Sequence, residues 1–250
     1  MHMRRLALTL ILASGVLANL SQAENSPAKV SLQLPPSAEL LYSIRAKQSG
    51  IPISGSATVK WQLNNQRYQI STETRAMLFG KILDISSEGK IDDYGLAPDK
   101  FYEKRFGKAA TTSNFERDSK TLKFTASPET YPLKGGEQDR SSATWQLIGL
   151  ARTMGDQFKT GSEWKMFVAG RRDAETWTFK VVGNETINTA LGSLNTVHVS
   201  KAPPADSKGQ QVDIWLAPSI EWYPVRIRFN DSDGEFVDQM LEEVKKTGAN

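Results

Sequence analysis

Histidine and cysteine are the first residues to seek in a search for catalytic chemistry, and this chain holds few of them. It has no cysteine and two histidines, and one of these, His2, lies at the extreme N-terminus. His198 lies in the alternating run 196–199, on the face opposite two valines. A Ser-His-Asp triad through His198 is arithmetically possible, but no serine lies in a Gly-x-Ser-x-Gly turn. The pattern favours a half-exposed strand histidine.

Metal sites are restricted to oxygen ligands, because the chain lacks thiolates and has so few histidines. The run 231–235, Asp-Ser-Asp-Gly-Glu, is superficially similar to a calcium loop. The EF-hand spacing would require an acid at position 229, which is Phe229. An Asp-Gly turn accounts for the run. We expect no catalytic residue, no metal site and no cofactor, and we predict that the protein is not an enzyme. A hydrolase using His198 is the less favoured alternative.

The polar step Gln138-Asp139-Arg140 directly precedes an apolar stretch that predicts a helix. Acidic residues suit the positive end of a helix dipole, and an arginine near a core is usually paired. Two interpretations follow. The step is either an ion-pair latch that joins helix to sheet, or an anion contact at a helix N-terminus. We favour the latch.

A second basic feature lies near the C-terminus. In the strand-like run 223–229, Val225, Ile227 and Phe229 form one face, and Arg226 and Arg228 form the other. A solvated strand face explains this alternation. The functional alternative is an interaction face for an anionic head group or a protein partner.

Charge argues against a nucleic-acid partner. The chain has a net charge of +3, but residues 1–23 contribute two arginines and no acid. The remainder holds 29 basic and 28 acidic residues, so no strongly basic body is left to bind phosphates.

The N-terminus has the three parts of a secretory signal peptide. Arg4 and Arg5 precede an apolar core at 6–20, and Ser21-Gln22-Ala23 offers small residues for cleavage. We predict cleavage after Ala23 and a periplasmic location. Residues 24–37 contain three prolines and predict a flexible linker. No later segment is apolar for about 18 residues, so no transmembrane segment is expected in the mature protein.

Period-two alternation runs along most of the remaining chain, as in 54–63, where Val59, Trp61 and Leu63 alternate with polar residues. We expect about a dozen strands, with the turn spacing of an all-β sheet or barrel. A flat open sheet of that size would be unusual. The predicted fold is therefore mainly β: a strongly bent antiparallel sheet or barrel-like fold that wraps one central helix at about 139–154. Residues 38–247 are expected to form a single domain.

The predicted helix is apolar nearly all round, which is typical of a buried helix. The chain also has six tryptophans. Such aromatic residues fill a large β core or line an apolar cleft, and the sequence leaves both open. If there is a cleft, the expected ligand-binding residues are Trp145, Leu147, Ile148, Ala151, Trp61 and Trp177.

Several of these stretches carry a resemblance to a known family. They are Gly136-Glu137-Gln138-Asp139-Arg140 before a Leu-rich helix, Trp215-Leu216-Ala217-Pro218, Pro224-Val225-Arg226-Ile227-Arg228, Gly50-Ile51-Pro52 and Gly170-Arg171-Arg172. Over about Leu40 to Val244 the chain resembles the DUF3108 family of exported proteobacterial proteins of unknown function. Residues 141–144 are more polar than the aliphatic run usual after the arginine. The resemblance implies an exported, mostly β protein and no established activity.

Two functions are compatible with these features. The favoured one is a non-enzymatic periplasmic protein that binds an apolar or amphipathic, lipid-like ligand in the concave side of a curved sheet. The alternative is an envelope scaffold or protein-interaction module with an envelope protein as partner.

Overall fold

The computed structural model describes residues 29–203 and 209–247. The predicted signal peptide, 1–23, and the first part of the predicted linker lie outside the described residues. The strands form a 15-stranded sheet in the order β8-β7-β6-β5-β4-β3-β2-β1-β15-β14-β13-β12-β11-β10-β9. Their bounds are β1 (Ala38–Gln48), β2 (Ile51–Asn64), β3 (Arg67–Ala76), β4 (Gly80–Asp92), β5 (Gly95–Arg105), β6 (Thr111–Glu116), β7 (Thr121–Phe124), β8 (Thr130–Pro132), β9 (Gln138–Asp139), β10 (Glu163–Ala169), β11 (Ala174–Thr189), β12 (Gly192–Lys201), β13 (Gln211–Ala217), β14 (Tyr223–Asn230) and β15 (Phe236–Lys246). The helices are α1 (Ser142–Met154) and the 3-10 turns η1 (Gly155–Gln157) and η2 (Pro218–Ile220).

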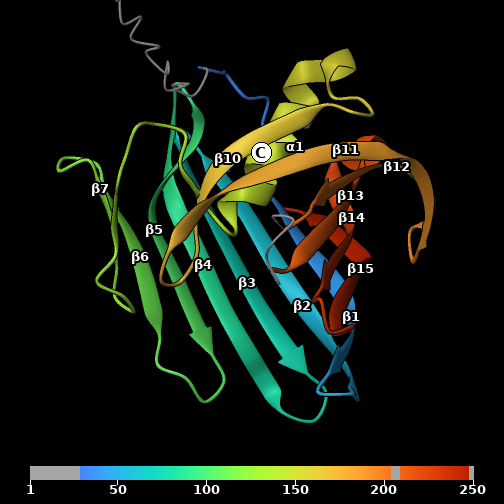
Figure 1. Cartoon of the computed structure of the whole chain (residues 1–250). Helices are drawn as coiled ribbons and strands as arrows, with labels where there is room; N and C mark the ends of the chain where they lie inside the picture. Colours follow the sequence, from blue (N-terminus) through green and yellow to red (C-terminus); the bar gives the residue numbers. More distant parts are fainter. Residues whose placement is uncertain (1–28, 204–208, 248–250) are drawn as a thin grey trace, which may run out of the picture.

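The sheet is an antiparallel meander that bends back on itself (Figure 1). The first strand, β1, pairs with the last, β15, as well as with β2, so the ladder is continuous across the two ends of the domain. Among the strands of residues 29–203 and 209–247, only β9 pairs in parallel, with β10. The two edge strands are β8 and β9, which are consecutive in the chain. The predicted mainly β, strongly bent antiparallel fold around one helix is confirmed, and the sheet stays unclosed between these edges.

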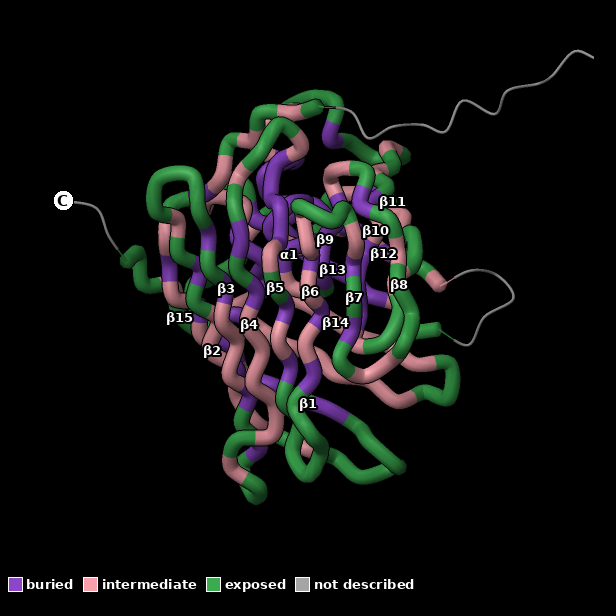
Figure 2. The backbone as a smooth tube through the Cα atoms, turned by 90° about the vertical axis from the view of Figure 1, so that its left-hand side faces the viewer, coloured by how far each residue is buried: buried purple, intermediate pink, exposed green. Residues whose placement is uncertain are grey.

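Alternation of side chains gives the bent sheet its interior. In β1, the buried positions Ala38, Leu40, Tyr42, Ile44 and Ala46 alternate with positions that are more exposed. Figure 2 shows the same change between buried and exposed positions along other strands. Since side chains in a strand point to alternate faces, one face of the sheet lines the interior and the other faces solvent.

Side chains close the seam that the backbone ladder leaves open. Residues of β5, β6 and β7 form a small apolar cluster with Ala169 at the end of β10. The Tyr131 ring packs edge-on against Phe167, with centroids 5.5 Å apart. The Ser113 hydroxyl donates a hydrogen bond of 2.7 Å to the carbonyl of Gly170. The two ends of the sheet are therefore in contact although no ladder joins them.

Helix α1 lies inside the bend, near one end (Figure 1). Nine of its 13 residues are buried. Trp145 stacks on Trp61 of β2 with ring centroids 4.4 Å apart and planes 10° apart. The helix starts at Ser142, later than the predicted position 139. The difference arises because Gln138 and Asp139 pair as β9 with Val168 and Ala169.

The linker prediction is wrong for residues 29–37. Val30, Leu32 and Leu34 pack against the main core, and the Val30 amide donates to the carbonyl of Asp93 at 2.7 Å. A Cβ added to Gly149 would lie 2.8 Å from Leu32 Cδ1, so this glycine lets the segment approach the helix closely. The prolines suggested a tether, but the alternating apolar residues between them bind the segment to α1.

Candidate functional site

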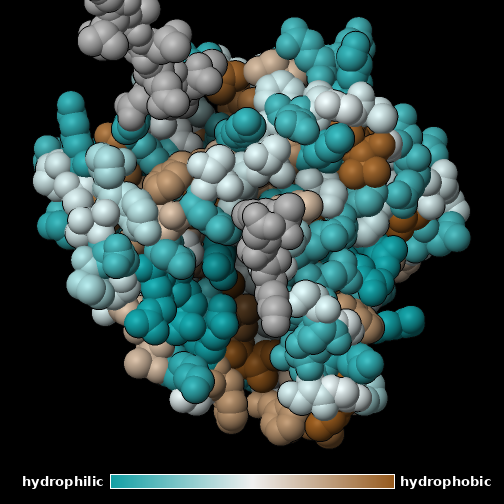
Figure 3. Space-filling model, in the orientation of Figure 1, coloured by the Kyte–Doolittle hydropathy of each residue, from teal (hydrophilic) through white to brown (hydrophobic). Residues whose placement is uncertain are grey.

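A cavity of about 710 Å³ lies within the bent sheet and extends to the start of α1. Its apolar wall comes from both halves of the sheet and includes Leu40, Tyr42, Ile44, Val59, Ile70, Ile85, Phe101, Phe179, Val212, Ile214, Ile227 and Phe229. In Figure 3 brown side chains are visible in a recess between teal ones, toward the lower end of the molecule. Sites for small organic ligands commonly have volumes of about 300–1,000 Å³ and mostly apolar walls, and this cavity matches both properties.

Charged residues also line the cavity, and they include Arg75, Glu103, Arg105, Arg140, Glu175 and Lys201. Arg140, Glu175 and Lys201 form one group among them, the ionic region. Glu103 is 3% exposed and lies 2.5 Å from Arg105 Nε and 3.1 Å from Arg171 Nε. The cavity is thus amphipathic, with a large apolar wall and a smaller ionic region.

Lys201 is a buried cation in this ionic region. Its side chain is 7% exposed, and its Nζ lies 3.6 Å from Glu175 Oε1 and 4.8 Å from the centre of the Trp177 ring. Burial lowers the pKa of Lys201, and the charge of Arg140 acts in the same direction. Two cations and one exposed carboxylate therefore share this side of the cavity.

The residues predicted to bind a ligand fall into two groups. Trp145 and Trp177 line the cavity. Trp61, Leu147, Ile148 and Ala151 are buried in the main core and do not line it. Trp61 lies behind Trp145, and its Nε1 donates to the Pro35 carbonyl at 3.0 Å. Only the first turn of α1, through Ser141, Thr144 and Trp145, forms the floor of the cavity.

The step Gln138-Asp139-Arg140 divides into a buried and an exposed part. Gln138 Nε2 donates to the Leu96 carbonyl at 2.6 Å. Asp139 Oδ1 accepts the backbone N–H groups of Ser141 and Ser142, both at 2.8 Å. The Ser87 hydroxyl donates to Asp139 Oδ2 at 2.5 Å. These bonds join β9, the helix start and the sheet, so the latch consists of hydrogen bonds.

Burial raises the pKa of Asp139 to about 6. The hydrogen bonds from Ser87, Ser141 and Ser142 oppose this shift, because they favour the charged form. Burial has the larger effect, so the carboxyl group is near the midpoint of its titration in mildly acidic solution.

Arg140 has a different environment from its two neighbours. It is exposed, it lines the cavity, and it forms no ion pair with any described residue. A Cβ added to Gly170 would lie 3.0 Å from its Nη2, so the guanidinium extends over the β10–β11 turn. Of the two interpretations of this step, Arg140 fits the anion contact and the other two residues fit the latch.

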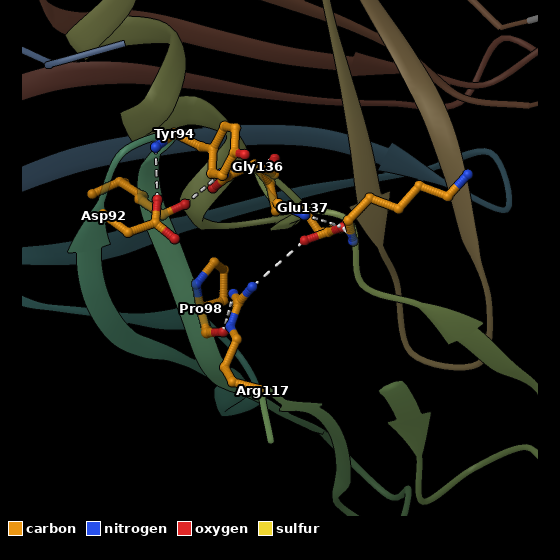
Figure 4. A network of polar contacts seen from close by, with 10 residues as sticks. Asp92, Tyr94, Pro98, Arg117, Gly136 and Glu137 are labelled. Carbon is orange, nitrogen blue, oxygen red and sulfur yellow. Dashed lines mark hydrogen bonds and ion pairs between the residues drawn. The ribbon is translucent and has the colours of Figure 1, made fainter. Parts of the chain in front are cut away.

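Glu137, just before this step, holds the loop that leads into β9 (Figure 4). It accepts the backbone N–H groups of Lys134 and Gly135. Arg117 lies 3.5 Å from its carboxylate and donates to the Pro98 carbonyl at 2.7 Å. The network ties the loop between the sheet edges to β5, so most of the 136–140 motif serves to position the seam.

Arg226 and Arg228, the predicted interaction face, share one carboxylate. Arg226 makes a bidentate contact with Asp238, at 2.8 and 2.6 Å, and Arg228 lies 3.5 Å from it. The Arg226 guanidinium lies 4.7 Å from the centre of the Trp215 ring. Both cations are thus held within the sheet, and an interaction with a partner stays a prediction.

His198 stacks on Trp215 with ring centroids 4.4 Å apart. Its Nε2 lies 3.0 Å from Asp213 Oδ1 and its Nδ1 lies 3.0 Å from Glu185 Oε1. A catalytic triad would require a nucleophile at one ring nitrogen. Among the described residues, each nitrogen faces a carboxylate instead.

The predicted Asp-Gly turn lies between β14 and β15. The carboxylates of Asp231, Asp233 and Glu235 lie within 4.8 Å of one another. Asp233 accepts the Glu235 amide at 3.1 Å, and Asp231 accepts Gln210 Nε2 at 3.0 Å. Glu235 accepts the Ser49 amide, so each of the three carboxylates has a hydrogen-bond donor.

Sequence reasoning missed Lys201 and Thr72 as cavity residues. The signal for Lys201 was present, because it continues the inward face of Val197 and Val199. Thr72 lies between Ile70 and Thr74 on the inward face of β3. Strand alternation alone therefore places both polar side chains on the inward face.

The sequence profile described as "Protein of unknown function (DUF3108)" matches residues 41–242. The chain belongs to the DUF3108 family. No curated protein matches it. Among the described residues of this DUF3108 protein, no helix is long and apolar enough to cross a membrane.

Several solved structures are similar to this DUF3108 protein. One is a β-barrel-like protein of the DUF1849 family from Brucella abortus, with a TM-score of 0.57 and 12% identity, covering 87% of this chain and 100% of that chain. A second is a domain assigned to outer membrane lipoprotein sorting from Vibrio parahaemolyticus, with a TM-score of 0.31 and 7% identity, covering 86% of this chain and 87% of that chain. A third is a DUF1329 protein from Desulfovibrio piger, with a TM-score of 0.30 and 6% identity, covering 86% of this chain and 88% of that chain. The first likeness supports the fold alone, and the other two, with TM-scores below 0.5, carry no argument.

Proposed function

We propose that this protein is a non-enzymatic periplasmic binding protein that holds an amphipathic, lipid-like ligand in the cavity. The observation that carries the proposal is the cavity itself, about 710 Å³ with a mainly apolar wall. A packed interior normally leaves few voids larger than a water molecule. A space of this size with a mainly apolar lining supports a binding function.

The ionic region supports an amphipathic ligand over a purely apolar one. Arg140 has no ion-pair partner among the described residues, and Lys201 has a carboxylate at 3.6 Å. An anionic head group could contact Arg140 while its chain lies against the apolar wall, since charge-assisted hydrogen bonds to arginine are strong. The ligand class we propose is therefore a chain-bearing anion, such as a fatty acid or an acidic phospholipid.

A fluorescent fatty-acid probe tests this proposal. Thr72 lines the cavity on β3, and its neighbour Ser71 points to the other face. The variant Thr72→Trp should lower probe affinity by at least about tenfold, since an indole would occupy cavity volume. Ser71→Trp adds the same indole outside and should leave affinity unchanged.

Equal probe affinity in the wild type, Thr72→Trp and Ser71→Trp would contradict binding in the cavity. Melting temperatures of both variants, measured in parallel, separate a filled cavity from a damaged fold. A probe that fails to bind the wild-type protein, with no lipid extracted from it, would also contradict the proposal.

The alternative, an envelope interaction module that acts through Arg226 and Arg228, makes a separate prediction. Replacing both arginines by alanine should then remove a co-purified partner. Because both arginines contact Asp238, the control is Asp238→Asn, which removes the carboxylate charge and leaves both cations. Loss of the partner in the arginine variant alone would favour the alternative.

A further inference from the structure

Large apolar side chains gather at the tips of three turns. Seven large hydrophobic residues are exposed among the described residues, and five lie in or beside the β1–β2, β3–β4 and β5–β6 turns. We call these five the loop-tip crown; they are Ile51 (63% exposed), Met77 (80%), Leu78 (87%), Phe79 (60%) and Phe106 (66%). Scattered exposed apolar residues are ordinary, but a group of large ones on neighbouring turns marks an interaction surface.

The three turns are held at the same end of the molecule (Figure 1). The Met77 amide donates to the Ser54 carbonyl at 3.0 Å, and the Phe106 amide donates to the Ile82 carbonyl at 2.8 Å. Each bond joins one turn to the neighbouring strand pair. The crown is therefore a set of side chains held together by the sheet.

The crown lies beside the open end of the cavity. Ala76, directly before Met77, and Arg105, directly before Phe106, both line the cavity. Helix α1 forms the opposite end, through Trp145. A surface that docks the crown would lie next to the cavity mouth.

The chain near the crown is basic. The segments 45–51, 73–84 and 103–108 hold seven basic and three acidic residues. Lys108 and Lys104 lie beside Phe106, and Lys104 Nζ contacts the Lys108 carbonyl at 2.6 Å and no carboxylate of the described residues. Apolar side chains flanked by cations match an anionic lipid surface, in which the chains enter the interface and the cations contact head groups.

We propose that the loop-tip crown docks the protein on an anionic lipid bilayer. The apolar side chains project from separate tips, which suits a fluid interface better than a continuous protein face. The β14–β15 turn at the same end is acidic, and Glu235 accepts the Ser49 amide beside Ile51. Because an anionic bilayer would repel this acidic turn, we expect the β3–β4 and β5–β6 turns to form the centre of the contact with the bilayer. Docking holds whether or not the cavity carries a ligand.

Vesicle flotation of the mature chain tests the proposal. The vesicles contain phosphatidylglycerol and phosphatidylethanolamine, or phosphatidylcholine alone. Wild-type protein should float with the anionic vesicles and at least about tenfold less with the neutral ones. The variant Met77→Ser/Leu78→Ser/Phe79→Ser should lose at least about tenfold in partitioning, since three apolar side chains leave the interface. Lys104→Gln/Lys108→Gln should weaken flotation and reduce its salt dependence.

The matched control is Leu191→Ser. Leu191 is 43% exposed in the β11–β12 turn and lies outside the crown. It should float like the wild type. Absence of wild-type flotation, or equal loss in the control and the triple variant, would overturn the proposal. Crown-dependent dimerisation in light scattering, without vesicle binding, would overturn it in favour of a second copy of the chain. Binding of the fatty-acid probe in the cavity is measured in a separate experiment, so a failure of the proposed ligand binding can be distinguished from a failure of bilayer docking.

Discussion

Asp139 stabilises the start of α1 with a buried carboxyl group. Its Oδ1 accepts the N–H groups of Ser141, which precedes the helix, and of Ser142, the first helical residue, and neither N–H has a partner within the helix. Its Oδ2 accepts the Ser87 hydroxyl of β4. The same residue therefore caps the helix and joins it to the sheet, at the cost of a raised pKa.

Asp139→Asn should change how stability depends on pH. The folded-state pKa of about 6 lies above the unfolded value, so the folded protein holds the proton more tightly. The free energy of unfolding of the wild type should then fall, relative to the variant, as pH rises from about 4 to about 7, by up to about 3 kcal/mol. Urea denaturation of both proteins at several pH values measures this difference in the free energy of unfolding. A difference independent of pH would contradict the burial of this carboxyl group.

Arg140→Gln tests the anion contact. Removing the charge should weaken binding of an anionic amphiphile by about tenfold, the usual scale of one charge-assisted hydrogen bond. Binding of an uncharged amphiphile of equal chain length should change little. Arg45→Gln, on the outward face of β1, is the control for general electrostatic effects. Equal losses for both ligands would indicate that Arg140 supports the fold instead.

The difference between Asp139 and Arg140 could not be predicted from their sequence. Both belong to one polar step before a helix, and local chemistry allowed an ion-pair latch as well as an anion contact. The outcome depends on β10, whose pairing with Gln138 and Asp139 buries these two side chains. That strand lies beyond the helix in the chain, so local pattern carries no information about it.

At the scale of elements, several contacts position α1. Trp145 stacks on Trp61, and Gln146 bridges the β4–β5 connection through the Leu96 amide and the Tyr94 carbonyl, both at 2.8 Å. On another side, Gly149 lets residues 29–37 lie against the helix. The helix thus closes one end of the bent sheet and leaves only its first turn to the cavity.

Gly149→Val should destabilise the protein by about 1–3 kcal/mol, the usual cost of overpacking. The new side chain would collide with Leu32, since even a Cβ would lie 2.8 Å from its Cδ1. Thermal or urea unfolding measures the change. In a Leu32→Ala background the cost of Gly149→Val should be smaller, because the collision is relieved. Additive costs would show that the N-terminal segment does not press on the helix.

The strands and the helix were the predictable elements. Period-two alternation, as in β2 and β3, indicates a half-buried strand from local sequence alone. The all-round apolar stretch predicted the buried helix. Residues 29–37 were misjudged because the three prolines of 24–37 are typical of a linker, while the packing of 29–37 depends on a glycine more than a hundred positions later. The open seam between β8 and β9 likewise depends on contacts between distant strands.

At the scale of the whole molecule, the fold combines a continuous ladder across the chain ends with an open seam. The seam is held by the Tyr131–Phe167 contact and the Ser113–Gly170 bond, so the bend does not require a closed ladder. The helix occupies one end, and the turns that carry the loop-tip crown occupy the other. The cavity therefore lies between the first turn of α1 at one end and the loop-tip crown at the other.

The composition of the cavity could be predicted in part. Inward alternating positions identify which strand residues face the interior. Whether that interior is filled is a property of the summed volumes, and no local pattern reports it. Trp145 and Trp177 line the cavity, while Trp61 fills the core behind it, and nothing in their local sequences separates these tryptophans.

The occupancy of the cavity is the most direct test of this account. Native mass spectrometry of the gently purified mature chain should show an added mass of a single chain-bearing anion, confirmed by extraction. The Thr72→Trp variant should lose that mass, and Ser71→Trp should keep it. A wild-type protein that carries no lipid and takes none up from anionic vesicles would contradict the proposed binding function.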